Sequence, residues 1–177
     1  MVIFIHGATH TGKTLAAQKI LEKYKYPYIS SDHIKMGLIR RGYTSLVPED
    51  DGKLTDYLWP VLREMAKTAV ENKQNLVIEG CYIPPDWKND FSEDYLENIR
   101  YKAIILSEDY ITENFEKIKA HACDIECRQD DSGLSKEQLI KENADILGRC
   151  KKYDNPYILI DACSDYNPYI IRDMLFY

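Results

Sequence analysis

The sequence lacks a long hydrophobic run and an excess of basic residues. No apolar stretch approaches the roughly 18–20 residues that a membrane-spanning helix needs. The apolar stretch at the N-terminus is shorter than the hydrophobic region of a signal peptide, which takes about 7–15 residues. We therefore expect a cytoplasmic protein without a membrane partner. The formal net charge is −6, whereas general nucleic-acid binding usually needs a basic face, so we expect no nucleic-acid partner.

The sequence also lacks the paired CxxC motifs that are typical of structural zinc sites. In a cytoplasmic protein we expect its cysteines to be thiols, and these are Cys81, Cys123, Cys127, Cys150 and Cys163. His121, Cys123 and Cys127 lie close together, but their spacing fits no standard zinc knuckle. We interpret them as small buried or half-buried residues of a helix, and no metal or catalytic role is assigned to them.

No Gly/Ser-rich linker, repeat or low-complexity segment divides the chain. Its 177 residues suffice for one domain with a hydrophobic core, so we expect residues 1–177 to form a single domain. Short apolar runs alternate with helical stretches, which is typical of an α/β protein with a parallel sheet and crossover helices. The predicted strands are Val2–His6, Pro27–Ser30, Leu76–Glu79, Ala103–Leu106 and Tyr157–Ile160.

The apolar periodicity predicts helices in most of the segments between these strands. They cover about residues 12–24, 34–41, 54–70, 109–127 and 135–152, with a last helix beginning at Asn167. We expect Asp32 to cap the second helix, Val47–Lys53 to form a loop and Pro60 to kink or divide the long third helix. The fourth and fifth helices interrupt the strand–helix alternation, so we interpret residues of about 120–150 as an inserted helical lid.

The strongest motif follows the first strand. Gly7, Ala8, Thr9, His10, Thr11, Gly12, Lys13 and Thr14 match the pattern GxxxxGK[ST]. Its glycines let the backbone turn tightly around an anion, and the N-terminus of the next helix adds a positive dipole end. Lys13 can reach the β and γ phosphates of a nucleotide, and the Thr14 hydroxyl can ligate Mg²⁺. The motif therefore predicts binding of ATP and Mg²⁺.

The motif alone does not separate kinases, GTPases and other ATPases. A GTPase reads guanine with an NKxD-type motif after a strand, but the nearest string, Asn72–Asn75, lacks the aspartate and precedes a strand. A motor ATPase usually shows an apolar strand that ends in Asp-Glu, and the chain has none. A small-molecule kinase needs an acid near the acceptor, cations over the transferred phosphate and a closing lid. The chain offers candidates for all three.

The candidate acids are Asp32 and Glu79, which follow or end the second and third predicted strands. Because the carboxyl ends of parallel strands face the ligand crevice, both acids are expected there. Asp32 would serve the acceptor hydroxyl, although it can also be only a helix cap. Glu79 would bind Mg²⁺ through water or orient the acceptor, although it can also be a plain strand-end acid.

Three arginines are candidates for contacts with anions. Arg128 and Arg149 flank the insertion and can swing over the phosphates, because the donor fork of guanidinium matches phosphoryl oxygens. Arg40 lies one to two turns past Asp32 and can bind an anionic acceptor. Arginines on helix surfaces are common, so a plain solvent-facing role is the alternative for each of them.

Three segments resemble those of a known family. GATHTGKT, SSDHIKMGLIR and LVIEGCYIPP are similar to the P-loop small-molecule kinases of the 2-phosphoglycerate kinase kind, which are relatives of adenylate, shikimate and gluconate kinases. The resemblance implies a three-layer α/β/α P-loop NTPase fold whose parallel five-stranded sheet has the order 2-3-1-4-5. It also implies that Asp32 acts at the acceptor hydroxyl and that Arg128 or Arg149 is a lid arginine.

We therefore expect an ATP-dependent phosphotransferase that moves the γ-phosphate of ATP to a small metabolite. The acceptor would be a 2-phosphoglycerate-like compound, a sugar or sugar acid, or a nucleoside monophosphate. The lid segment is acidic and poor in arginine, which keeps open a nucleotide-dependent regulator or slow ATPase without a small-molecule acceptor. A binding module without turnover is a further alternative, which the intact Gly12-Lys13-Thr14 opposes. The acceptor, the preference for ATP over other nucleotides and the oligomeric state stay open.

Overall fold

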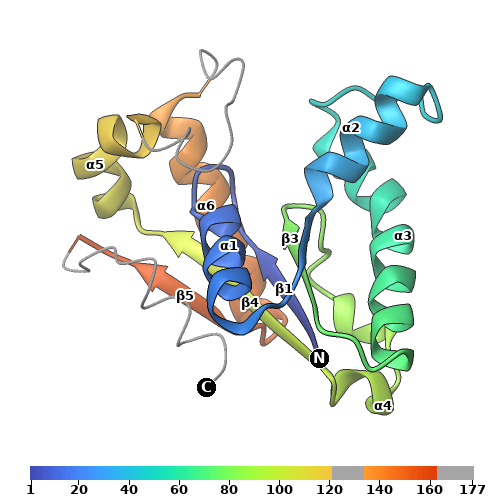
Figure 1. Cartoon of the computed structure of the whole chain (residues 1–177). Helices are drawn as coiled ribbons and strands as arrows, with labels where there is room; N and C mark the ends of the chain where they lie inside the picture. The colour runs from blue at the N-terminus through green and yellow to red at the C-terminus, as the bar shows by residue number, and fades with distance from the viewer. Residues whose placement is uncertain (121–133, 163–177) are drawn as a thin grey trace.

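The protein is built around a five-stranded parallel sheet. The computed structural model describes residues 1–120 and 134–162. The strands are β1 (Val2–His6), β2 (Tyr28–Ser30), β3 (Leu76–Gly80), β4 (Ile99–Leu106) and β5 (Tyr157–Ile160). Neighbouring strands pair in parallel in the order β2-β3-β1-β4-β5 (Figure 1). The predicted α/β class and strand order are therefore confirmed.

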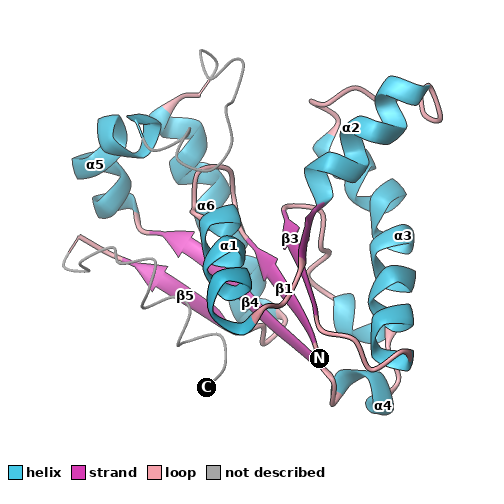
Figure 2. Cartoon of the chain, in the orientation of Figure 1, coloured by secondary structure: helices cyan, strands magenta, loops and turns pink. Residues whose placement is uncertain are grey.

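Helices cover both faces of this sheet and produce three layers (Figure 2). They are α1 (Lys13–Tyr24), α2 (Ser31–Arg41), α3 (Asp51–Glu71), α4 (Glu93–Leu96), α5 (Glu108–Ala120) and α6 (Lys136–Lys152), with the 3₁₀ helix η1 (Trp87–Asp90). None of the helices in the described part of the chain is long and apolar enough to cross a membrane.

The two faces of the sheet bury separate hydrophobic cores. On β1, Phe4 packs in the core that α3 and η1 cover, whereas Ile5 packs in the core that α1 and α5 cover. Successive side chains of a strand point to opposite faces, and both faces of this sheet are buried. This is why β1 reads as a continuous apolar run, and it leaves the polar residues to the strand ends.

Some element boundaries differ from the prediction. The helix after β2 begins at Ser31, and Ser30 is its N-cap, so the prediction that Asp32 caps this helix is wrong. Asp32 lies in the first turn, where its negative charge complements the helix dipole. The predicted loop ends early because α3 begins at Asp51, and α3 continues through Pro60 without being divided.

The segment between β4 and β5 contains α5 and α6, and the predicted lid insertion of about residues 120–150 falls partly outside the described residues. Ser135 caps α6, since its hydroxyl accepts a hydrogen bond of 3.1 Å from the backbone N–H of Gln138. The Gln138 side chain bonds Glu142 instead of returning to Ser135, so only half of a capping box forms. The middle of the predicted lid, residues 121–133, and the helix predicted from Asn167 lie outside the described residues.

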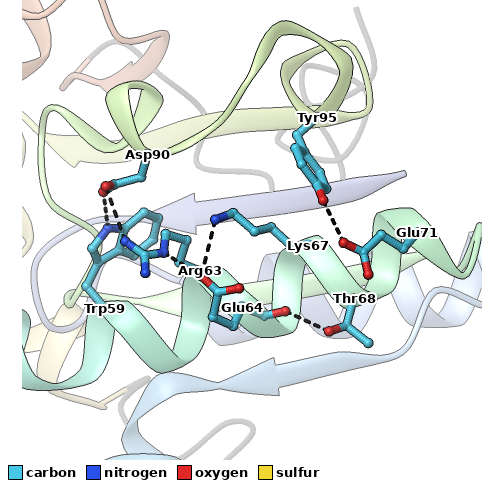
Figure 3. Close-up of polar contacts among 8 residues, drawn as sticks. All are labelled: Trp59, Arg63, Glu64, Lys67, Thr68, Glu71, Asp90 and Tyr95. Atoms are coloured by element: carbon cyan, nitrogen blue, oxygen red, sulfur yellow. Dashed lines mark hydrogen bonds and ion pairs between the residues drawn. The ribbon is translucent and has the colours of Figure 1, made fainter.

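Polar contacts fasten α3 to the segment that follows β3 (Figure 3). The indole N–H of Trp59 donates to Asp90 over 2.6 Å, and the Arg63 guanidinium contacts the same carboxylate over 3.3 Å. At the C-terminal end of α3, the Tyr95 hydroxyl donates a hydrogen bond to Glu71 over 2.6 Å. Together with the buried apolar stripe of α3, these contacts hold the helix beside the sheet and place its N-terminus near the carboxyl ends of the strands.

Candidate active site at the carboxyl ends of the strands

Residues 7–14 form the loop that joins β1 to α1, and glycine is required at both of its ends. The backbone of Gly7 has φ +156°, and a Cβ there would lie 2.5 Å from the carbonyl oxygen of Ile104. Gly12 has φ +82° and is the N-cap of α1. Both conformations belong to glycine because a side chain at positive φ is strained. The predicted tight turn is therefore present.

The loop presents a positive surface to an anion. No side chain caps the N-terminus of α1, so its first amides are available to a ligand. Lys13 is only 8% exposed, and its ammonium donates a hydrogen bond of 2.6 Å to the carbonyl of Ala8. Thr11 donates to the same carbonyl over 3.0 Å. Lys13 thus lies across the loop, within reach of any phosphate that the loop encloses.

His10 adopts φ +61°, and its ring Nδ1 lies 2.8 Å from the hydroxyl of its neighbour Thr9. The left-handed backbone of His10 turns the loop between the two glycines. A positive φ at a residue other than glycine is uncommon and often marks a functional loop. The sequence motif does not indicate this local ring contact.

Thr14 and Glu79 meet where β1 and β3 end. The Thr14 hydroxyl donates a hydrogen bond of 3.2 Å to Glu79, whose side chain is buried, with 1% of the residue exposed. Glu79 pairs in register with Ile5 of β1 and Ser30 of β2. The hydroxyl and carboxylate oxygens are hard ligands of the kind that Mg²⁺ prefers, so this pair fits the predicted metal.

Asp32 lies in a chain of polar contacts that links α2, the segment after β3 and α3. The ammonium of Lys35 contacts the Asp32 carboxylate over 2.6 Å and donates to the Tyr82 hydroxyl over 2.9 Å. The Tyr82 hydroxyl in turn donates to Asp51 over 3.1 Å. Burial raises the pKa of Tyr82 above its ordinary value, and the charges of Asp32 and Asp51 add to this, so Tyr82 stays a neutral donor.

Lys35 and Tyr82 were not among the residues predicted for the site. The spacing of Asp32 and Lys35, three positions apart on a helix, is a signal that marks neighbouring side chains. Nothing local connects Tyr82 with them, because it comes from the segment after β3. The structure therefore adds a cation and a phenol to the surroundings of Asp32.

Gly80 is the point where α2 approaches β3. It has φ +151°, and a Cβ there would collide with the hydroxyl of Ser31, the first residue of α2. The buried Ser31 hydroxyl has no hydrogen-bond partner among the described residues. Glycine at position 80 therefore lets the start of α2 pack directly against the end of β3. This packing places the first turn of α2, which contains Asp32, at the carboxyl end of β3, where Glu79 lies.

His6 at the end of β1 and Arg149 of α6 lie near each other. The Nδ1–H of His6 donates to the Gly80 carbonyl over 3.2 Å, and both His6 and Arg149 line one small pocket. Burial, with the charges of Lys13 and Arg149, lowers the pKa of His6 from 6.5 to about 4 against the opposing effect of the Gly80 bond. His6, which the motif does not include, is therefore neutral at physiological pH.

The remaining predicted residues are not brought into this group. Arg40 is exposed near the end of α2, about two turns beyond Asp32. Arg128 lies outside the described residues, as do His121, Cys123 and Cys127. Within the described ranges, no cluster of three or more histidine, cysteine or acidic side chains is arranged to hold a metal. The described cysteines, Cys81 and Cys150, are thiols as expected.

Comparisons with known proteins find similar structures. No protein-family model matches the chain, and no curated protein matches its sequence. A shikimate kinase from Bacteroides thetaiotaomicron is 14% identical, with a TM-score of 0.57 over 99% of this chain and 94% of that chain. Deoxyadenosine kinase from M. mycoides is 16% identical, with a TM-score of 0.55 over 99% and 97%. A gluconokinase from Sinorhizobium meliloti is 14% identical, with a TM-score of 0.54 over 97% and 87%.

The chain has the fold of the P-loop small-molecule kinases. The three neighbours match nearly its whole length, and the order of its strands is the one that the resemblance implied. Identities this low show the fold alone, because one fold hosts different reactions. The reaction therefore has to be argued from the residues at the carboxyl ends of the strands.

Proposed function

We propose that the protein is an ATP-dependent phosphotransferase that moves the γ-phosphate of ATP to a small-molecule acceptor. The observation that carries this proposal is the hydrogen bond between Thr14 and the buried Glu79, at the strand edge that also carries Asp32. These residues support transfer to an acceptor: the loop suits phosphates, the Thr14 and Glu79 oxygens suit Mg²⁺, and Asp32 would serve the acceptor. Nucleotide binding alone would need no acid for an acceptor.

The loop Gly7–Thr14 would bind the phosphates of ATP. The first amides of α1 would donate to the β-phosphate, and Lys13 would leave the Ala8 carbonyl for the β and γ oxygens. A charged acceptor of hydrogen bonds attracts the ammonium more strongly than a neutral carbonyl does. This exchange is consistent with the position of Lys13 across the loop.

Thr14 and Glu79 would hold Mg²⁺, the Thr14 hydroxyl directly and the Glu79 carboxylate directly or through water. When bound, the ion supplies charge neutralisation on the β and γ phosphates. The burial of Glu79 keeps its carboxylate in place, so Thr14 and Glu79 would fix the orientation of the triphosphate.

Asp32 would accept or orient the proton of the acceptor hydroxyl. In the transfer, the hydroxyl oxygen forms a bond to the γ-phosphorus, the bond to the β–γ bridging oxygen breaks, and ADP leaves. The positive charge of Lys35, which lies 2.6 Å from Asp32, would attract an anionic group of an acceptor bound beside that acid. Catalysis would come mainly from positioning and charge, as is usual for phosphoryl transfer.

ATP turnover with a panel of metabolites tests the proposal. The purified protein is given ATP, Mg²⁺ and one compound at a time from phosphoglycerates, sugars, sugar acids and nucleoside monophosphates. We expect ADP to form much faster with one class of compound than without it. The Lys13→Ala variant is the control, and it should lose this stimulated turnover while it keeps the fold.

The alternative functions give different results in the same assay. ADP formation that no compound stimulates, and that Lys13→Ala abolishes, would contradict the proposal and indicate an ATPase. ATP binding without turnover would indicate a regulator or binding module. Stimulated turnover that survives in Lys13→Ala would contradict the assignment of the loop as the donor site.

A further inference from the structure

A small pocket lies between the segment after β3, the N-terminal part of α3 and the C-terminal part of α6. It has a volume of about 50 Å³, and its lining includes His6, Cys81, Pro84, Tyr101, Arg149 and Asn155. A pocket of this size has room for a polar group of a few atoms. Cys81 in the pocket lining directly precedes Tyr82 in the sequence. Tyr82 contacts Lys35, which pairs with Asp32.

The hydrogen bond of His6 Nδ1 with Gly80 fixes the chemistry of the other ring nitrogen, Nε2. Nδ1 must carry the proton, because its partner is the Gly80 carbonyl, which only accepts. A neutral imidazole has one N–H, so Nε2 carries a lone pair and accepts a hydrogen bond. Burial and the neighbouring charges of Lys13 and Arg149 keep the ring neutral. His6 therefore offers an acceptor, and not a donor, to a ligand in this pocket.

Arg149 supplies the complementary chemistry. It is exposed on α6 and lines the pocket from the side of the solvent. Burial raises the pKa of the Tyr101 hydroxyl, so this side chain stays neutral. The lining therefore presents a neutral acceptor at His6 and a cation at Arg149. A ligand that satisfies both carries a hydroxyl donor beside an oxyanion.

We propose that His6 is a specificity-determining residue that accepts a hydrogen bond from a hydroxyl of the acceptor, next to an oxyanion of the same molecule at Arg149. The inference rests on the proposed function, because it assigns to this pocket the end of the acceptor that is remote from the transferred phosphate. Arg149 then acts on the acceptor rather than over the γ-phosphate. An acceptor that lacks this hydroxyl would cover the Nε2 lone pair without pairing it, which weakens its binding.

Binding of two matched pairs of small probes tests this inference without nucleotide. One pair is 2-hydroxypropionate and propionate, and the other is 2-hydroxyethyl phosphate and ethyl phosphate, so each pair differs in one hydroxyl. NMR titration of the full chain should show about fivefold to tenfold tighter binding of the hydroxylated member of at least one pair, as one neutral hydrogen bond provides. The pair that shows the preference identifies the oxyanion as carboxylate or phosphate.

Two variants of His6 separate its two nitrogens. In His6→Asn the amide N–H₂ takes the position of Nδ1 and can still bond Gly80, but nothing replaces Nε2. In His6→Gln the longer side chain brings its amide oxygen to the position of Nε2. We expect His6→Asn to lose the preference for the hydroxylated probe and His6→Gln to keep it. Thermal unfolding of both variants checks that the fold is intact.

The outcomes distinguish this inference from the proposed function. Equal binding within both pairs, or no binding of any probe, overturns the role of His6, as does a preference that survives in His6→Asn. An acceptor whose kcat/KM is the same in wild type and His6→Asn also overturns it, while phosphotransfer itself stands. A hydroxyl preference that depends on His6, without phosphotransfer to any compound, supports the pocket and contradicts only the kinase proposal.

Discussion

Thr14 donates a hydrogen bond of 3.2 Å to Glu79, although 65 positions separate the two residues in the sequence. This contact joins the first turn of α1 to the end of β3. It also brings together the two oxygens that we assign to Mg²⁺. The roles proposed for the surrounding residues lead to five predictions.

Replacing Glu79 tests the assignment of the Mg²⁺ site. Glu79→Gln keeps an oxygen that can accept from Thr14 but removes the negative charge, so Mg²⁺ should bind more weakly. The Mg²⁺ concentration for half-maximal ATP turnover should rise by about tenfold or more, as loss of a metal-site partner typically causes. An unchanged requirement for Mg²⁺ in a folded Glu79→Gln variant would show that Glu79 does not serve the ion.

Replacing Asp32 tests its role at the acceptor. Asp32→Asn retains the size and hydrogen bonding of the side chain but cannot take the acceptor proton. Its kcat should fall by about a hundredfold or more, with the affinity for ATP unchanged, and steady-state kinetics with separate titrations of ATP and acceptor measure both. Asp56→Asn, a change of an exposed acid on α3, is the matched control and should leave kcat unaffected. Normal turnover by Asp32→Asn would remove Asp32 from the mechanism.

Replacing Lys35 tests the attraction of an anionic acceptor. Lys35→Met keeps the length of the chain beside Tyr82 but removes the ammonium that contacts Asp32. The KM for the acceptor should rise by about tenfold, which corresponds to about 1.4 kcal/mol, while the KM for ATP stays the same. Tyr82→Phe should also raise the KM for the acceptor, but by less, because it leaves the Lys35 ammonium in place. If both variants keep the wild-type KM, the site does not use Lys35.

Replacing Gly80 tests the packing of α2 on β3. A Cβ at this position collides with Ser31 and requires a side chain at φ +151°, so Gly80→Ala should lower the free energy of unfolding by about 2 kcal/mol or more. Gly37→Ala in α2 is the control. No atom lies within 4 Å of its added Cβ, so this change should leave the free energy of unfolding unchanged or raise it slightly. Denaturant unfolding compares them, and equal stabilities would contradict the close approach.

The lowered pKa of His6 predicts how the free energy of unfolding depends on pH. The folded protein holds its pKa near 4, whereas the unfolded chain has the ordinary value of 6.5. Between these values the unfolded state binds more protons, so the contribution of His6 is fully present above pH 6.5 and is lost as pH falls toward 4. The loss is of the order of a few kcal/mol. Between pH 6.5 and 4, the free energy of unfolding should fall more steeply with decreasing pH for wild type than for His6→Gln. The same pH dependence in both proteins would contradict a neutral His6 ring.

The phosphate loop was predictable because its chemistry is local. Eight consecutive residues carry the whole pattern, and the flanking apolar periodicities of two and 3.6 residues supply its strand and helix. Glu79 was predictable as a strand-end acid for the same reason. Its contact with Thr14 requires β3 to lie beside β1, and that neighbour relationship came from the family resemblance and not from periodicity.

The surroundings of Asp32 were only partly predictable. Its cap role was wrong because Ser30 takes the N-cap position, and a run of polar residues before a helix offers several competing caps. Lys35 shares a helix with Asp32, so its spacing carries a signal. Tyr82 and Asp51 belong to other elements, and His6 precedes the motif on β1. Tertiary packing brings Tyr82 and Asp51 to Lys35, and His6 to Gly80, and no local pattern encodes these contacts.

The most direct test of the central claim follows the fate of the γ-phosphate. The protein is incubated with ATP labelled at the γ-phosphate, Mg²⁺ and the metabolite panel, and the labelled products are separated. The account predicts that the label moves into one small-molecule acceptor and that Lys13→Ala prevents this transfer. Label that appears only as inorganic phosphate, at a rate that no added metabolite changes, would contradict the claim that the protein is a small-molecule kinase.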